Sequence, residues 1–298
     1  MRVLVTGASG FIGSALTDAL VARGDQVIAW VHRSRPSNSS VEQVYNLSDI
    51  QGPVDAVVNL AGAPIADARW SDKRKALLLS SRIDTTRALV EWIASQPREI
   101  APKTLISGSA IGIYGATTSD EAIDESSSTL KEDFSANLCR QWEAEALKAT
   151  QSGMRVCLLR TGIVLGKGGA LAKMRLPFLM GGGGPIASGK QWMPWIHLDD
   201  EVDAIIHLLD RPDLEGAFNL TAPDPARNKE FVRAYAESLK RFALIPMPAL
   251  AVNLMLGSEA SALLTEGLKV MPTRLEQSGF HFTYPLLENA LKAVANSY

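Results

Sequence analysis

Short hydrophobic runs rich in β-branched residues recur through about the first 160 residues of the chain. They lie at Val3–Thr6, Gln26–Val31, Ala56–Leu60, Lys103–Ser107 and Arg155–Arg160. β-Branched residues favour strands. The stretch VDAVVNLAG, which spans the third run, has no polar alternation in its middle, as is typical of a strand buried on both faces. The pattern predicts strands of a parallel sheet.

Segments with helical periodicity separate these runs, at Ile12–Arg23, Asp72–Ser95 and Asp133–Gln151. The apolar residues in the second half of Asp72–Ser95 fall close to one helix face. Strands that alternate with helices indicate βαβ units around a parallel sheet. We therefore expect an α/β fold with a Rossmann-type doubly wound parallel sheet.

Beyond Gly162 the chain becomes rich in glycine and proline, and the expected elements are shorter. Asp199–Arg211 has a helical pattern with Asp199 as the expected N-cap, and Gly216–Thr221 is typical of a short strand. We expect residues 1–165, joined by segments from about 195–225, to form the large domain. Residues 166–298 should form mainly a smaller substrate lobe.

Composition and charge exclude several classes of protein. The chain has 298 residues, of which 46% are hydrophobic and 21% charged, as in ordinary globular proteins. A net charge of −2 favours neither nucleic acid nor an anionic membrane. The two cysteines do not suffice for a disulfide framework, and the histidines show no metal-ligand spacing. We expect a cytoplasmic protein with no metal, nucleic-acid or membrane partner, present as a monomer or weak homodimer.

Three glycines follow the first expected strand and open the first expected helix. Gly7, Gly10 and Gly13 form the pattern G-x-x-G-x-x-G. Residues without Cβ allow the backbone to approach a pyrophosphate, and a helix N-terminus supplies free N–H groups and a partial positive charge. In this strand–turn–helix context the spacing predicts a dinucleotide site. The alternative is a glycine turn that serves packing only.

The end of the second expected strand indicates which dinucleotide binds. An NAD site usually has an acidic residue about 20 positions after the glycines. Here that position holds Arg33, and no acidic residue occurs between Gln26 and Val41. A guanidinium binds a 2′-phosphate through charge-assisted hydrogen bonds, whereas a carboxylate repels it. The cofactor is therefore expected to be NADP(H); the alternative is a solvated basic loop.

Several motifs are similar to those of a known superfamily. TGASGFIG, NLAG, SGSAIGIYG and WIHLDD resemble the extended short-chain dehydrogenase/reductases. The longer segments Ala61–Arg82, Arg160–Phe178 and Gly181–His197 resemble an atypical branch, the epimerase family of NAD-dependent epimerase/dehydratase-like proteins. Gly267–Leu291 resembles that branch's short C-terminal domain of unknown function, which we place at residues 250–298.

The resemblance, together with the glycine pattern, gives a set of expected cofactor contacts. They are Gly7, Ser9, Gly10, Phe11, Ile12, Gly13, Arg33, Leu60, Ala61, Gly62, Arg82, Ser107 and Arg160.

The superfamily uses a Ser or Thr that bonds the substrate oxygen, a Tyr that transfers a proton, and a Lys four residues later. Hydride transfer to a carbonyl leaves an alkoxide, which needs a proton and hydrogen-bond donors. Ser109 matches the Ser. The segment DFSANLCRQWEAEA has Ser135 at the Tyr position and Cys139 at the Lys position. Further upstream, Arg82 matches an arginine that replaces an asparagine in the atypical branch.

The candidate catalytic residues are therefore Ser109, Cys139 and Tyr114. A nucleophilic Cys139 needs a lowered pKa, which Arg82 would supply if the two are close; the alternative is a small packing residue. Tyr114 is the phenol nearest to the expected site and could replace the missing Tyr as the acid. Its alternative role is to pack against or line the pocket. His197 either contacts substrate or bonds local backbone.

Two functions are consistent with these features. The first is an NADP(H)-dependent oxidoreductase or nucleotide-sugar-epimerase-like enzyme of unknown small-molecule substrate, with its proton supplied by water, Tyr114 or the substrate. The second is a non-catalytic NADP(H)-dependent sensor or regulatory protein, which the missing Tyr and Lys favour.

The cofactor prediction can be tested by binding titrations. NADPH should bind more tightly than NADH, and Arg33→Ala should reduce the difference because it removes the cation expected at the 2′-phosphate. Equal affinities of the unmodified protein for the two dinucleotides would contradict the prediction.

Overall fold

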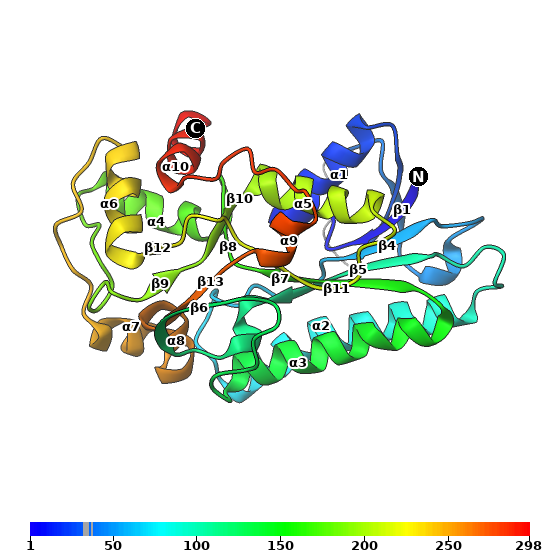
Figure 1. The fold of residues 1–298 in the computed structure, drawn as a ribbon, viewed down its shortest axis with the longest axis horizontal. Helices are drawn as coiled ribbons and strands as arrows, with labels where there is room; N and C mark the ends of the chain where they lie inside the picture. Colours follow the sequence, from blue (N-terminus) through cyan, green and yellow to red (C-terminus); the bar gives the residue numbers. More distant parts are fainter. Residues whose placement is uncertain (32–35, 37) are drawn as a thin grey trace.

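A seven-stranded sheet forms the centre of the computed structural model, which describes residues 1–31, 36 and 38–298 (Figure 1). All its strand pairs are parallel. In spatial order the strands are β11 (Gly216–Leu220), β7 (Arg155–Thr161), β5 (Thr104–Ala110), β4 (Ala56–Asn59), β1 (Arg2–Thr6), β2 (Gln26–Trp30) and β3 (Glu42–Val44). The strand order reverses between β1 and β4, as in a doubly wound sheet. The predicted fold class is confirmed.

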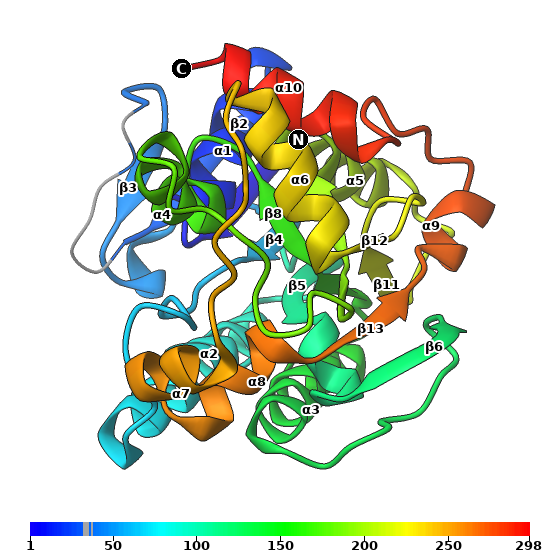
Figure 2. The same cartoon turned by 90° about the vertical axis from the view of Figure 1, so that its left-hand side faces the viewer.

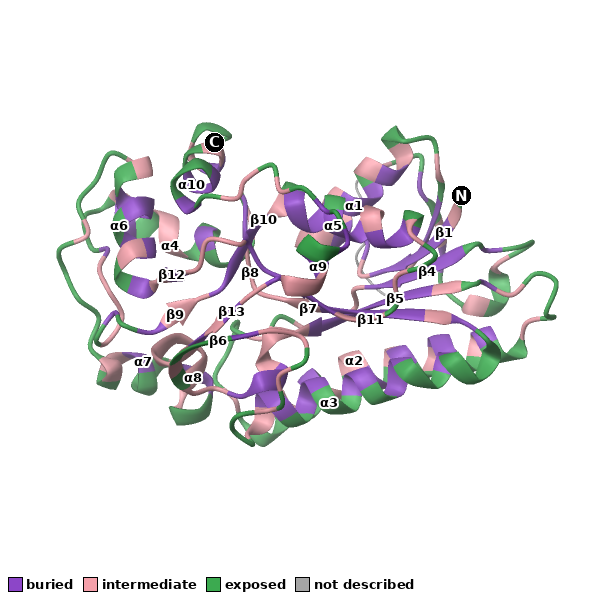
Figure 3. Cartoon of the chain, in the orientation of Figure 1, coloured by how far each residue is buried: buried purple, intermediate pink, exposed green. Residues whose placement is uncertain are grey.

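Helices cover both faces of this sheet, as Figure 1 shows. One face packs on α1 (Phe11–Ala22) and α5 (Leu198–Asp210), and the other on α2 (Asp72–Ser95) and α3 (Phe134–Leu147). Figure 3 shows buried residues along the strands and on the inner sides of these helices. The strands therefore form the middle layer of three, which explains their continuous hydrophobic sequences.

Much of the chain beyond β7 builds a second lobe around its own hydrophobic core (Figure 2). Its helices are α4 (Gly169–Leu179), α6 (Asn228–Ser238), α7 (Ala249–Leu256), α8 (Ser258–Thr265) and α10 (Leu287–Asn296). The short helix α9 (Thr273–Gln277) packs instead on β11, and its Leu275 belongs to the core of the central sheet. The strands of the lobe form two-stranded pairs: β8 (Ile163–Leu165) with β10 (Trp195–His197), β9 (Trp192–Met193) with β12 (Ala226–Arg227), and β13 (Gly267–Val270) with β6 (Thr118–Ile123). The last pair joins the lobe to the segment that follows β5.

The five expected strands of the first part are confirmed within three residues, and Asp72–Ser95 is helical over its predicted bounds. The predicted N-cap of α5 is wrong. His197, not Asp199, caps this helix, because its Nδ1 accepts a hydrogen bond from the Asp199 amide at 3.2 Å. A neutral imidazole nitrogen can accept such a bond, so the cap lies two residues earlier than the carboxylate suggested.

Glu201 on α5 is a fully buried acid between the helix and the sheet. Its Oε1 accepts a hydrogen bond from the Thr161 hydroxyl at 2.9 Å, and its Oε2 has no partner among the described residues. Burial raises the pKa of Glu201 to about 8, because the ionised form loses its hydration. Glu201 is therefore protonated at neutral pH.

This raised pKa predicts a pH-dependent stability. Between pH 4.5 and about 8 the unfolded chain loses the Glu201 proton while the folded chain keeps it. The contribution of Glu201 to the free energy of unfolding therefore falls as the pH rises. The Glu201→Gln variant should not show this loss of unfolding free energy between pH 5 and pH 8. The difference from the parent should be a few kcal/mol, at about 1.4 kcal/mol per pKa unit. Urea unfolding at pH 5 and pH 8 measures it.

Glu237→Gln, at an exposed position of α6, is the matched control and should keep the slope of the unmodified protein. A Glu201→Gln variant with that same slope would contradict the prediction.

Candidate functional site

The turn after β1 requires glycine at two positions. Gly7 has a φ of +68°, and a Cβ there would lie 2.6 Å from the carbonyl oxygen of Leu60. A Cβ on Gly13 would lie 2.1 Å from the carbonyl oxygen of Gly7. These contacts bring β1, α1 and the end of β4 together at the point where the strand order reverses, which is where open α/β sheets bind ligands.

The N-terminus of α1 is open at this turn. Its N-cap, Gly10, has no side chain to accept from the first amides, and no acidic residue lies in the first turn. Ser9 and Gly10 are exposed, while Phe11 and Ile12 are half-buried. Free amides and a positive helix end that face solvent fit a pyrophosphate. The structure thus brings together the predicted contacts of this turn.

The segment after β4 lies against this turn, at the switch point of the sheet where open α/β folds bind ligands in a crevice. Leu60 and Ala61 are half-buried and Gly62 is exposed. The guanidinium of Arg82 lies directly behind Gly62, since a Cβ there would be 3.0 Å from the Arg82 Cζ. Arg82 also lies over the ring of Trp142, with its Cζ 5.2 Å from the ring centroid. The cation predicted from the sequence is therefore at the crevice. Arg33 lies outside the described residues.

The ring of Phe11 connects the crevice to the second lobe. A Cβ on Gly168 would lie 2.5 Å from this ring, and one on Gly166 would lie 2.7 Å from it. The glycines of the segment GKGG therefore let the start of α4 close onto the phosphate-binding turn. The glycines of this family-like motif thus serve the packing of the second lobe against Phe11.

Ser107 belongs to a buried chain of hydrogen bonds that the sequence did not predict. Asn59 donates to the hydroxyls of Thr86 at 2.8 Å and of Ser107 at 3.3 Å, and accepts from Thr6 at 2.7 Å. Trp142 donates to Thr86 at 3.0 Å. The chain ties β1, β4 and β5 to α2 and α3. Ser107 is fully buried within it.

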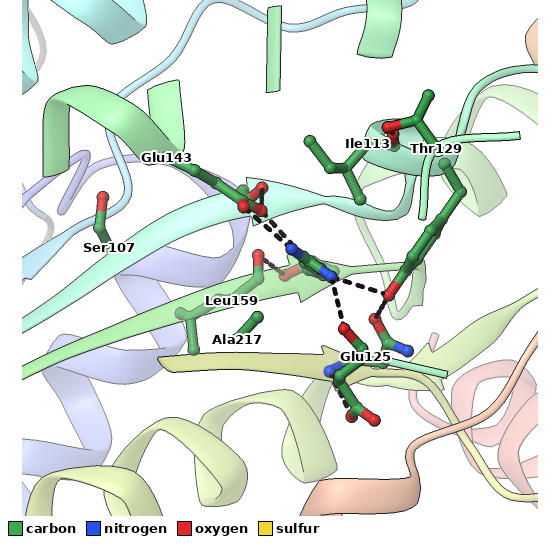
Figure 4. A network of polar contacts seen from close by, with 12 residues as sticks. Ser107, Ile113, Glu125, Thr129, Glu143, Leu159 and Ala217 are labelled. Carbon is green, nitrogen blue, oxygen red and sulfur yellow. Dashed lines mark hydrogen bonds and ion pairs between the residues drawn. The ribbon is translucent and has the colours of Figure 1, made fainter. Parts of the chain in front are cut away.

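A second buried network centres on Arg160, at the end of β7 (Figure 4). Its Nε and Nη2 donate to the two carboxylate oxygens of Glu143 at 2.9 and 3.0 Å. Ser109 donates to the same carboxylate at 2.7 Å. Glu143 comes from α3 and Ser109 from β5, so this ion pair fixes one helix against two strands. The Ser109 hydroxyl is engaged here and not at the surface of a pocket.

The phenol of Tyr114 completes this network. Its hydroxyl accepts from Arg160 Nη1 at 3.1 Å and donates to Asn219 Oδ1, on β11, at 2.8 Å. The backbone carbonyl of Glu125 also accepts from Arg160 (3.3 Å), and Figure 4 shows Glu125 and Glu143 on opposite sides of the network. Burial raises the pKa of Tyr114. The hydroxyl of this buried phenol therefore both accepts and donates a hydrogen bond within the network.

Cys139 packs beneath the turn η2 (Ile111–Tyr114) that follows β5. A Cβ on Gly112 would lie 3.6 Å from the Cys139 sulfur and 3.3 Å from the Ser135 Cβ. Larger side chains at either position, such as the usual Tyr and Lys, would occupy the space of this turn. The two replacements in DFSANLCRQWEAEA therefore allow η2 to lie directly on α3.

The expectation that Arg82 activates Cys139 fails on electrostatic grounds. Arg82 does lower the pKa of the thiol, but burial and the nearby Glu143 carboxylate outweigh it and raise that pKa to about 12. The thiol is therefore neutral at physiological pH, and a thiolate is the nucleophilic form. The packing alternative fits this geometry.

A cavity of about 120 Å³ lies between the end of β5 and the second lobe. Its wall includes Ile111 and Gly112 from η2, Ile163 from β8, and residues of β9, α8 and β13. Of the tryptophans near it, Trp192 lines the cavity, whereas Trp195 is buried in the core of the second lobe. His197 does not line it. Its ring caps α5 and stacks on Tyr284 with centroids 4.0 Å apart.

These features define a nucleotide-binding α/β protein, with an open glycine turn at the switch point of a doubly wound sheet. The chain belongs to the NAD dependent epimerase/dehydratase family, whose model matches residues 3–221. Residues 247–294 match a domain of unknown function, DUF1731. The resemblance predicted from the motifs is confirmed over both parts of the chain.

Similar proteins include the chloroplastic SDR39U1 homolog of Arabidopsis thaliana, 41% identical over 309 residues, covering 99% of this chain and 86% of that protein. The crystal structure of human epimerase family protein SDR39U1 (isoform 2) with NADPH is 37% identical, covers 100% of both chains and has a TM-score of 0.91. UDP-glucose 4-epimerase of Thermotoga maritima with UDP-glucose is 19% identical over 99% of this chain and 98% of that one (TM-score 0.80), a likeness of fold alone.

Two negative findings concern the described residues. No helix among them is both long and apolar enough to cross a membrane. Within the same part of the chain, no three His, Cys, Asp or Glu side chains lie together as metal ligands would.

Removal of one partner of the Arg160–Glu143 ion pair should destabilise the protein strongly. The two side chains are 13% and 10% exposed, so Glu143→Gln leaves a buried guanidinium without its counter-charge, which costs roughly 3–5 kcal/mol. Urea unfolding measures this loss. Glu132→Gln, in the exposed pair with Arg140, is the control and should cost at most about 1 kcal/mol. Equal effects of the two variants would contradict the proposed role of the network.

Proposed function

We propose that the chain is an NADP(H)-dependent oxidoreductase or epimerase-like enzyme that acts on a small molecule. The observation that carries this proposal is the open N-terminus of α1 behind Gly7, Gly10 and Gly13, at the switch point of the sheet. The NADPH in the crystal structure of the human relative supports it. Hydride transfer is the chemistry that NADPH supplies when it is bound.

The residues of the crevice would divide the work of binding. The amides after Gly10 would hold the pyrophosphate, and Leu60, Ala61 and Gly62 would form the opposite wall. Arg82 would add positive charge behind that wall. Arg33 would select the 2′-phosphate, as the sequence predicts. The binding site would thus extend along the carboxyl edge of β1 and β4 towards the cavity beside β5.

The substrate would occupy the cavity beside Ile111 and Gly112. Among the candidate groups, the Cys139 thiol is neutral and buried and the Tyr114 hydroxyl is held by Arg160 and Asn219. Water and the substrate itself remain as proton sources, and we propose that one of them supplies the proton. Ser109 would then act as a positioning residue, because its hydroxyl fixes the Glu143 carboxylate. The cytoplasmic location and the monomeric or weakly dimeric state stay predictions.

Gly10→Ala tests the binding of the pyrophosphate with little disturbance of the fold. Gly10 has an ordinary φ of −78°, and a Cβ there lies 3.0 Å from the Gly7 carbonyl oxygen, so the backbone can adapt. The methyl group would project at the site where the phosphates approach. NADPH affinity should fall about tenfold or more, which corresponds to at least about 1.4 kcal/mol. Fluorescence titration with NADPH measures the effect.

Gly182→Ala is the matched control, because its Cβ would meet only the Pro177 carbonyl oxygen, at 3.4 Å. It should leave NADPH affinity unchanged, and both variants should unfold within about 1 kcal/mol of the parent. Unchanged NADPH affinity in a folded Gly10→Ala protein would contradict the proposed cofactor site.

A further inference from the structure

We infer that the cavity takes a small, uncharged, mostly apolar carbonyl compound and not a nucleotide sugar. The inference rests on the proposed function and names the substrate class of the same site. It is argued from the wall, the charges, the free hydrogen-bonding groups and the size of the cavity.

The wall of the cavity is mostly apolar, and Asn228 and Glu266 are its polar side chains other than the Trp192 indole among the described residues. The aliphatic and aromatic lining residues are Ile111, Ile163, Ile186, Trp192, Met193, Leu263, Leu264, Leu268 and Val270. They come from η2, β8, β9, α8 and β13 and from the segment before β9, so both lobes contribute. Each sugar hydroxyl buried against such a wall without a hydrogen-bond partner would weaken binding. Burial of an alkyl or aryl group would strengthen it.

The charges disfavour a pyrophosphate. Glu266 alone is charged among the lining residues that the structure describes. Its carboxylate lies 3.2 Å from the Lys131 ammonium, so this cation is already paired. A diphosphate carries two negative charges and needs cations or helix N-termini around it. This wall presents a carboxylate instead.

Two further cations lie on the Trp192 ring. The Arg227 guanidinium is 4.3 Å and the Lys269 ammonium 5.5 Å from the ring centroid. Arg227 also forms an ion pair with Asp120 at 2.9 Å and donates to the Lys190 carbonyl at 2.6 Å. These contacts use two of the five donors of the guanidinium, so Arg227 is the residue to test if an anion does bind.

The polar side chains near the cavity are also engaged. Asn228 Oδ1 accepts from the Ile186 amide at 2.8 Å, and its Nδ2 donates to the Met193 sulfur at 3.0 Å. The Trp192 indole donates to Asp120 at 3.2 Å. A sugar ring would find few free partners here, and sites that recognise hydroxyls are built with such partners.

The size agrees with a small ligand. The volume of about 120 Å³ is close to that of apolar cavities that bind benzene, at about 150 Å³. Drug-sized ligands need about 300 Å³ or more, and a nucleotide sugar is at least of that size. In the reaction, the carbonyl carbon accepts hydride from NADPH and its oxygen takes a proton from water. The products are an alcohol, NADP⁺ and hydroxide.

Calorimetric titration of the NADPH-loaded protein tests this inference, with acetophenone and UDP-glucose as the two probes. Acetophenone should bind and UDP-glucose should not. Leu264→Trp fills the cavity from α8 and should weaken acetophenone binding about tenfold or more. Leu263→Phe adds less volume to the cavity and replaces Leu264→Trp in the experiment if that variant fails to fold. Leu254→Trp, at a 79% exposed position of α7, is the control and should bind acetophenone as the parent does.

Three results would overturn the inference. They are binding of UDP-glucose that Arg227→Ala abolishes, no binding of acetophenone, or equal binding of acetophenone by folded Leu264→Trp and the parent. NADPH affinity is measured on the same samples. Failure to bind NADPH would remove the proposed function itself, whereas normal NADPH binding with UDP-glucose in the cavity would remove only the substrate class.

Discussion

The buried ion pair between Arg160 and Glu143 is the interaction on which the carboxyl edge of the sheet depends. It joins the end of β7 to α3, and it reaches β5 through Ser109 and β11 through Tyr114 and Asn219. Two charges taken out of water are stabilised only while both remain and their other hydrogen bonds are made. The network therefore holds three neighbouring strand ends in one arrangement. The cavity lies beside those ends.

The helix that carries Ser135 and Cys139 in place of the Tyr and Lys pair also contributes to this network. Ser135 and Cys139 are small enough for η2 to lie on α3, and Trp142 and Glu143 on the same helix supply the polar contacts. The segment DFSANLCRQWEAEA thus supports the site from below. Its thiol has no role that needs ionisation, because burial keeps it neutral. Among the residues it contains, none contacts the cavity directly.

The sequence predicted the fold class and the glycine turn at the switch point of the sheet, because both depend on local patterns. Hydrophobic runs with a strand period and the glycines at Gly7, Gly10 and Gly13 require only neighbouring residues to be interpreted. The catalytic candidates were harder, since the state of Ser109 or Tyr114 depends on Glu143, Arg160 and Asn219, which are distant in the chain. No short motif signals such contacts. Burial and the Glu143 carboxylate also outweigh the lowering effect of Arg82 on the pKa of Cys139, and burial at one residue is a tertiary property.

A crystal structure of the protein with NADPH tests the central claim most directly, since that claim joins the glycine turn and the apolar cavity into one site. The account predicts the pyrophosphate at the amides that follow Gly10 and the nicotinamide ring at the mouth of the cavity, beside Ile111 and Ile163. A nicotinamide directed away from these residues, or a pyrophosphate bound anywhere other than at the α1 N-terminus, would contradict it.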